Sequence, residues 1–123
     1  MKVFVYYNLH RKTWSIRAME GPRKGLVVAH SDTVLLGDAK GKVSESGRLR
    51  VLQEGRKNVH AGIIGQLISL SRAPIPLDSC EITYNPYKYA GFVLKGLGDL
   101  WQGGDIVAMD RRKVYSSIER SIL

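Results

Sequence analysis

The sequence predicts an α+β domain that is mainly β, arranged as an antiparallel meander or a partly open barrel with one short helix. Three observations support this prediction. Apolar and polar side chains alternate near the N-terminus, as in strands. Clusters of glycine and proline recur along the chain and predict turns. A single stretch begins with a helix-capping hydroxyl group, which predicts one helix. The chain has 123 residues, 44% of them hydrophobic, so it can bury one core but not two. We therefore expect residues 1–123 to form a single domain.

The N-terminal third predicts an antiparallel meander. Lys2 to His10 alternates with period two and is rich in β-favouring residues, and Thr13 to Met19 alternates again after a short connection. A turn at Gly21–Gly25 then leads into a third expected strand, Leu26 to His30.

The next stretch predicts a strand, a loop and the helix. Thr33 to Leu36 is expected to be a short strand, and the glycine-containing residues 37–42 a loop. Ser44 supplies a hydroxyl cap for about two turns of helix that end at Gly55. Gly47 lowers the helix propensity of this segment.

The second half predicts a central strand followed by shorter ones. Val59 to Leu70 is apolar on both alternating faces, which favours a strand buried on both sides, and β-branched residues with two glycines disfavour a helix. Residues 72–78 read as an irregular connector. The later strands are expected at Glu81 to Asn85, Ala90 to Leu94, Ile106 to Met109 and Lys113 to Ile118.

The composition predicts an anionic binding partner and no membrane-spanning segment. The formal net charge is +8, and the cations are spread along the chain without a basic tail, which favours a folded patch or pocket over a disordered arm. Charge for solubility alone is the competing explanation. The apolar runs are too short to cross a bilayer, and no signal-peptide pattern opens the chain. A single cysteine fits a reducing cytosol.

Known catalytic patterns are absent, so we expect a non-enzyme with no catalytic residues, no metal and no cofactor. Neither a Gly-Lys-Ser/Thr phosphate loop nor a zinc-ligand spacing occurs. Gly62-Ile63-Ile64-Gly65 matches the Gly-x-x-Gly of a KH domain only in its letters, because its middle residues are apolar.

The stretch from Gly55 to Gly65 is the first candidate binding site. It contains two members of the densest group of cations, Arg48, Arg50, Arg56 and Lys57, and places charged and polar side chains before a buried run. If the strand begins at Val59, alternation places Arg56, Asn58 and His60 on one side, where they could hold a phosphate. The alternative is a basic loop that simply enters a core strand.

A tyrosine-rich turn, Tyr84-Asn85-Pro86-Tyr87-Lys88-Tyr89, is the second candidate. Aromatic rings beside a cation suit stacking on a nucleobase, although tyrosines that cover a core edge would look the same.

Trp101 lies between glycines and is either a lid over a pocket or a plug on the core. The expected ligand-binding residues are Arg48, Arg56, Lys57, Asn58, His60, Tyr84, Tyr87, Lys88, Tyr89 and Trp101.

Three stretches, Lys2–His10, residues 42–62 and residues 84–89, resemble a family of small uncharacterised proteins encoded by tailed bacteriophages. The resemblance covers most of the chain and carries no motif of assigned chemistry. It implies expression in the cytoplasm of a bacterial host and a task in infection, such as host takeover or evasion of host defence.

The leading hypothesis is non-catalytic binding of a nucleotide or other phosphorylated small molecule, as a sponge for a cyclic nucleotide signal of antiviral immunity. The alternatives are a DNA- or RNA-binding module and an inhibitor that docks on an acidic host protein. The sequence leaves the oligomeric state open, a homo-oligomer included.

Overall fold

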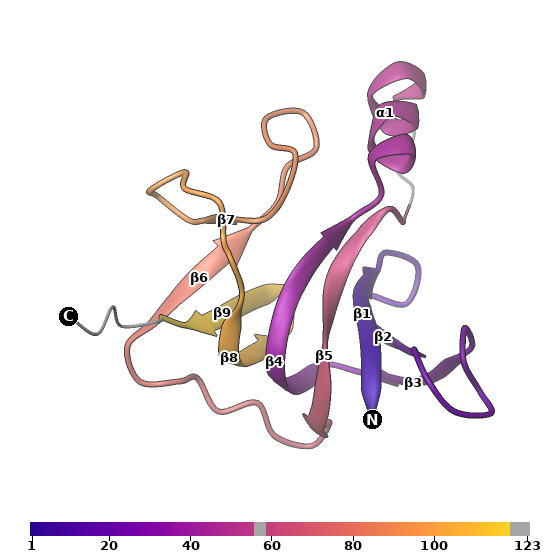
Figure 1. The fold of residues 1–123 in the computed structure, drawn as a ribbon, viewed down its shortest axis with the longest axis vertical. Helices are drawn as coiled ribbons and strands as arrows, with labels where there is room; N and C mark the ends of the chain where they lie inside the picture. The colour runs from indigo at the N-terminus through magenta and orange to yellow at the C-terminus, as the bar shows by residue number, and fades with distance from the viewer. Residues whose placement is uncertain (56–58, 119–123) are drawn as a thin grey trace.

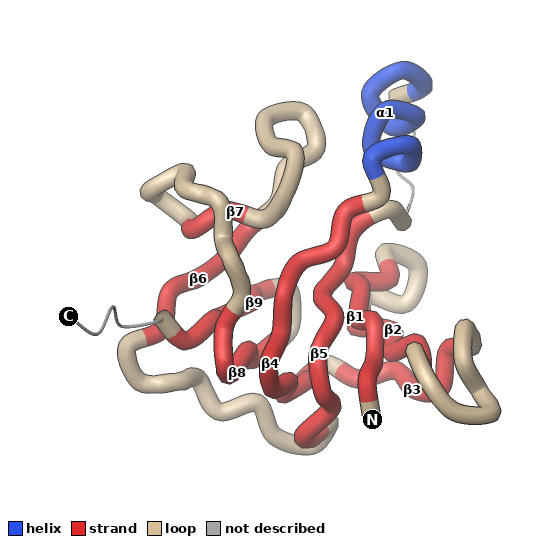
Figure 2. The backbone as a smooth tube through the Cα atoms, in the orientation of Figure 1, coloured by secondary structure: helices blue, strands red, loops and turns tan. Residues whose placement is uncertain are grey.

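The computed structural model describes residues 1–55 and 59–118, where nine strands form one antiparallel sheet and one helix projects from its end (Figures 1 and 2). The elements are β1 (Lys2–Asn8), β2 (Thr13–Ala18), β3 (Val27–Ser31), β4 (Thr33–Val43), α1 (Glu45–Glu54), β5 (Ala61–Ser69), β6 (Ser79–Thr83), β7 (Val93–Leu94), β8 (Gly104–Asp110) and β9 (Lys113–Ser117).

The strand order is β3-β2-β1-β5-β4-β8-β9-β6-β7, and the sheet is not closed into a barrel. The predicted mainly β class, the one short helix and the N-terminal meander β1-β2-β3 are confirmed. The predicted central strand is also confirmed, because β5 pairs with β1 on one side and β4 on the other.

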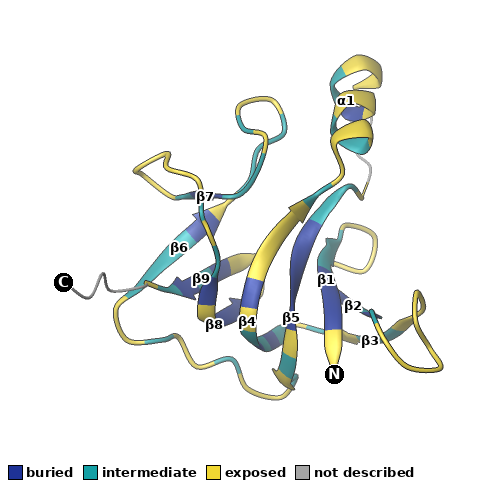
Figure 3. Ribbon diagram, in the orientation of Figure 1, coloured by how far each residue is buried: buried dark blue, intermediate teal, exposed yellow. Residues whose placement is uncertain are grey.

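One face of the curved sheet holds the core. Side chains from both halves of the sheet meet there in a single cluster. The buried residues of the strands are coloured dark blue in Figure 3. Leu36 of β4, Ile63 of β5 and Met109 of β8 are fully buried in it. The opposite face of the sheet therefore remains available to solvent wherever no loop crosses it.

The chain passes from the edge strand β3 directly to the interior strand β4, and the turn is fixed by one carbonyl group. Leu70 O accepts hydrogen bonds from Ser31 Oγ at 2.9 Å and from Thr33 Oγ1 at 2.6 Å. Two hydroxyl groups, one from the end of β3 and one from the start of β4, thus bind the residue that follows β5. Residues 72–78 that follow contain no helix or strand, as predicted (Figure 1).

The predicted loop at residues 37–42 is wrong, because β4 continues through it to Val43. The β4–β5 register shifts at Leu35/Leu36 and again between Gly37 and Lys40. At the second shift Asp38 adopts a φ of 46°, and pairing with β5 resumes from Lys40 onward. A Cβ on Gly41 would lie 2.7 Å from the Phe92 ring. Position 41 therefore requires glycine because the Phe92 ring packs against the strand there, and not because the chain turns.

The later strands have shifted bounds. The strand predicted at Ala90 to Leu94 is reduced to Val93–Leu94. The backbone around it bonds instead to residues 99–101, where the chain folds back. Trp101 N donates to Phe92 O at 2.8 Å and Leu94 N donates to Asp99 O at 2.8 Å. The other predicted strands of the second half, in β6, β8 and β9, are confirmed with small changes at their ends.

Helix α1 begins and ends at the predicted residues. The Ser44 Oγ accepts from Gly47 N at 3.2 Å, which caps the N-terminus. Gly55 adopts the left-handed conformation, with a φ of 66°, and its N–H donates to Val51 O at 2.9 Å. Val51 is the one buried residue of the helix, so α1 contributes little to the hydrophobic core.

Candidate functional site

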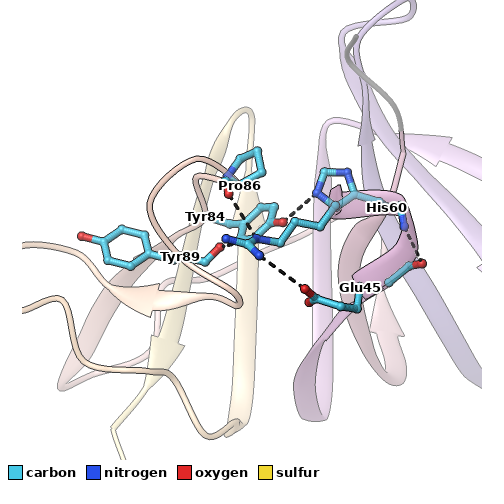
Figure 4. Close-up of polar contacts among 8 residues, drawn as sticks. Glu45, His60, Tyr84, Pro86 and Tyr89 are labelled. Atoms are coloured by element: carbon cyan, nitrogen blue, oxygen red, sulfur yellow. Dashed lines mark hydrogen bonds and ion pairs between the residues drawn. The ribbon is translucent and has the colours of Figure 1, made fainter. Parts of the chain in front are cut away.

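Four predicted site residues meet where α1, the start of β5 and the loop after β6 come together (Figure 4). Tyr84 OH and His60 Nε2 lie 2.6 Å apart, within hydrogen-bond distance. Arg48 Nε donates to the carbonyl oxygens of Pro86 and Tyr89, each at 3.1 Å. Segments about forty residues apart in the chain are thus joined by side-chain hydrogen bonds.

The Arg48 side chain is largely enclosed by these contacts. It is 17% exposed, and its Nη1 lies 3.4 Å from the Glu45 carboxylate one helical turn away. A guanidinium has five donors in a fixed plane, and these bonds orient that plane toward the loop. Arg48 therefore holds the tyrosine-rich turn against α1.

A row of aromatic rings continues from this junction toward the core. The ring centroids are 5.5 Å apart for His60 and Tyr84, 5.2 Å for Tyr84 and Phe92, and 6.3 Å for Phe92 and Trp101. Trp101 Nε1 donates to the buried Ser116 Oγ at 2.9 Å. Trp101 therefore plugs the core at the end of this row, while its remaining surface lines a hollow.

Tyr89 joins this junction through its backbone oxygen, whereas Tyr87 and Lys88 do not join it. Tyr87 is 64% exposed and Lys88 is exposed at the tip of the same turn. The predictions for Arg56, Lys57 and Asn58 lie outside the described residues. The prediction that Arg56, Asn58 and His60 share one side assumed a strand that begins at Val59. The strand β5 begins at Ala61, so His60 precedes it.

Burial raises the pKa of the Tyr84 hydroxyl. The nearby Arg48 guanidinium acts against this shift by favouring the phenolate, whereas the Glu45 carboxylate adds to it. The folded state therefore favours the neutral phenol. The associated stability is fully present below the unfolded pKa of 10.0 and is lost as the pH rises through the higher folded pKa.

We expect Tyr84→Phe to remove one late-titrating tyrosine from an absorbance titration of the folded protein. The change in melting temperature above pH 10 should also be smaller in the variant than in the wild type. The bond to Glu81 raises the pKa of Lys95, so the stabilising effect of that ion pair is also lost over this pH range. Both proteins contain this pair, so the difference between their melting temperatures reports the Tyr84 hydroxyl alone. Tyr87→Phe is the control and should retain the late step. An unchanged titration in Tyr84→Phe would contradict the assignment.

A hollow of about 260 Å³ lies beside Trp101, between β4 and the segment that carries β7. We call it the Trp101 hollow. Its lining residues are Gly41, Val43, Ala90, Gly91, Phe92, Leu100, Trp101 and Gln102. Trp101 was singled out in the sequence by its flanking glycines. Gly41, Phe92 and Gln102 were missed, because only the fold brings residues 41 and 92 into contact.

Within the described residues, no group of three His, Cys, Asp or Glu side chains is placed to hold a metal ion. The same part of the chain contains no helix that is long and apolar enough to span a membrane.

Residues 1–117 match the model of a family described as Mycobacterium phage L5 gene 82 protein. The Gene 82 protein of Mycobacterium phage L5 is 50% identical over 99 residues, which cover 76% of this chain and 77% of that protein. No solved structure matches. The family match includes every strand and the helix, and it confirms the predicted resemblance to small phage proteins.

Proposed function

This chain belongs to the phage L5 gene 82 protein family, and we propose that it binds a phosphorylated nucleotide without altering it chemically. The observation that carries the proposal is the Trp101 hollow, an aromatic-lined depression in a domain with a net charge of +8. Phosphorylated ligands are drawn to such a domain by its overall field.

The hollow suits a nucleobase. Its volume of about 260 Å³ is just below the usual range of small-molecule sites, roughly 300–1,000 Å³. A base could lie against the Trp101 and Phe92 rings, with its sugar and phosphates outside. The Gln102 amide both donates and accepts hydrogen bonds, so it could pair with the edge of the base. The Tyr84 ring packs against the Phe92 ring, and His60 packs in turn against Tyr84.

Membership of a phage family supports a more specific form of the proposal. In the cytoplasm of an infected bacterium, a domain that sequesters a cyclic nucleotide immune signal needs affinity only, with no catalytic group. The absence of known catalytic patterns from the sequence is consistent with this task.

Titration calorimetry against cyclic dinucleotides, cyclic trinucleotides and cyclic ADP-ribose isomers tests the proposal. We expect saturation by at least one of these at an integral ratio per chain. Gln102→Ala should weaken that binding about tenfold, because it removes a hydrogen bond of about 1.4 kcal/mol. Gln66→Ala, at an exposed position of β5, is the matched control and should bind normally.

The ligand is then recovered and analysed by chromatography. Unchanged ligand supports sequestration, and a chemically altered ligand would show an enzyme instead. No binding to any of the compounds at high micromolar concentration would overturn the proposal.

A further inference from the structure

The solvent face of the sheet carries cations on both sides of an apolar strip. In the pairing register Arg17 lies opposite Phe4, Phe4 opposite Ile64, and Ile64 opposite Lys40. Residues directly opposite each other in antiparallel strands share a face, so these four side chains form one row across β2, β1, β5 and β4. Tyr6 and Lys42 lie two residues further along their strands and therefore share this face.

The guanidinium group of Arg17 is held by two aromatic rings. Its Cζ lies 5.5 Å from the ring centroids of both Phe4 and Tyr6, which are themselves 6.0 Å apart. Within the described residues Arg17 has no hydrogen bond or ion pair to an acid, so the rings orient its donors without occupying them. A guanidinium fixed in this way suits a phosphate group.

Lys40 and Lys42 supply the second group of charges. Both are exposed, and neither forms an ion pair within the described part of the chain. Three strand spacings separate Arg17 on β2 from Lys40 on β4, roughly 14 Å. One phosphate cannot contact cations that far apart, whereas a chain of phosphates can.

We propose that this surface, formed by Phe4, Tyr6, Arg17, Lys40, Lys42 and Ile64, binds single-stranded nucleic acid. We call it the Arg17–Lys42 face. The three cations contact phosphates along the strand, and the partly exposed Tyr6 ring stacks on an unpaired base. Phe4 is only 8% exposed and serves mainly to support Arg17. A duplex has no free base face for Tyr6, so single strands are preferred.

This surface is distinct from the Trp101 hollow. Gly41 and Val43 line the hollow, and the alternation of β4 places Lys40 and Lys42 on the opposite side of the sheet. The two proposals therefore rest on different residues of the same strand, and either can fail without the other.

Fluorescence polarisation with labelled dT20, rU20 and a blunt DNA duplex, across a series of salt concentrations, tests the inference. We expect the wild type to bind the single strands more tightly than the duplex. A Lys40→Gln/Lys42→Gln variant should bind single strands at least tenfold more weakly. Its plot of log affinity against log salt should also be shallower by about 1.4, since each lost phosphate contact removes about 0.7. Tyr6→Leu should also weaken binding, and its slope should fall by at most about 0.7, because Tyr6 helps to orient one phosphate-contacting cation, Arg17.

Lys24→Gln/Lys88→Gln removes the same charge from two exposed turns and is the matched control. Gln102→Ala should also retain oligonucleotide binding, which separates this site from the Trp101 hollow. Equal losses in the two lysine variants would show attraction by net charge alone and overturn the proposal. Duplex binding as tight as single-strand binding would overturn it too. Circular dichroism should show that all variants fold, because exposed cations contribute little to stability.

Discussion

Replacing Gly47 with alanine is expected to destabilise the protein, although the same change in most helices stabilises by up to about 1 kcal/mol. A Cβ at this position would lie 2.6 Å from His60 Cβ and 3.3 Å from Ser44 Oγ. Neither Cβ can rotate away, because each is attached directly to the backbone. Overpacking of this kind costs about 1–3 kcal/mol, which exceeds the gain in helix propensity.

Urea denaturation of Gly47→Ala should therefore show a lower midpoint than the wild type. Gln53→Ala, at an exposed position of the same helix, is the control, and its midpoint should change little or rise slightly. Because His60 would be displaced, the late titration of Tyr84 should also shift in Gly47→Ala. A more stable Gly47→Ala protein would show that α1 does not press against His60.

The elements that could be predicted from the sequence depend on local patterns. The hairpin of β1 and β2 follows from two alternating runs separated by a short connection, and its register pairs Asn8 with Thr13. The helix follows from a capping hydroxyl at Ser44 and a left-handed glycine at Gly55. In both cases the residues that determine the structure lie within a few positions of each other.

The elements that were missed depend on contacts between distant parts of the chain. Residues 37–42 have the composition of a loop, yet they form strand because β5 and β8 pair with them from both sides. Gly41 is explained by Phe92, and Gly47 by His60. A glycine that makes room for a distant side chain looks the same in the sequence as a glycine that makes a turn.

The candidate site shows the same division. The sequence predicted Arg48, His60 and the tyrosine-rich turn as ligand contacts in separate stretches of the chain. The structure brings Arg48, His60, Tyr84 and Tyr89 together, and their polar groups bond mainly to each other and to backbone. Their role as ligand contacts stays a prediction. The Arg17–Lys42 face was missed, because alternation alone does not reveal which strands lie side by side.

Gly62→Ala is expected to have the largest effect on stability, a loss of about 3 kcal/mol or more. A Cβ on Gly62 would lie 2.5 Å from Val5 O, and 2.5 and 2.7 Å from Cζ and Cε2 of the Phe4 ring. The ring could rotate, but the carbonyl oxygen belongs to β1, whose pairing with β5 would have to open. Gly91→Ala is the control, since its Cβ would meet only Leu100 Cδ2 at an ordinary 3.6 Å.

The same substitution connects the fold to the Arg17–Lys42 face. The Phe4 ring that lies over Gly62 also supports the Arg17 guanidinium, so moving the ring should misplace that cation. Urea denaturation should show the loss of stability, and polarisation with dT20 under conditions where the variant remains folded should show weaker binding. If Gly62→Ala were as stable as the wild type and bound dT20 equally well, the Phe4 ring would not lie over Gly62. Arg17 would then lack the support on which the proposed nucleic-acid surface depends.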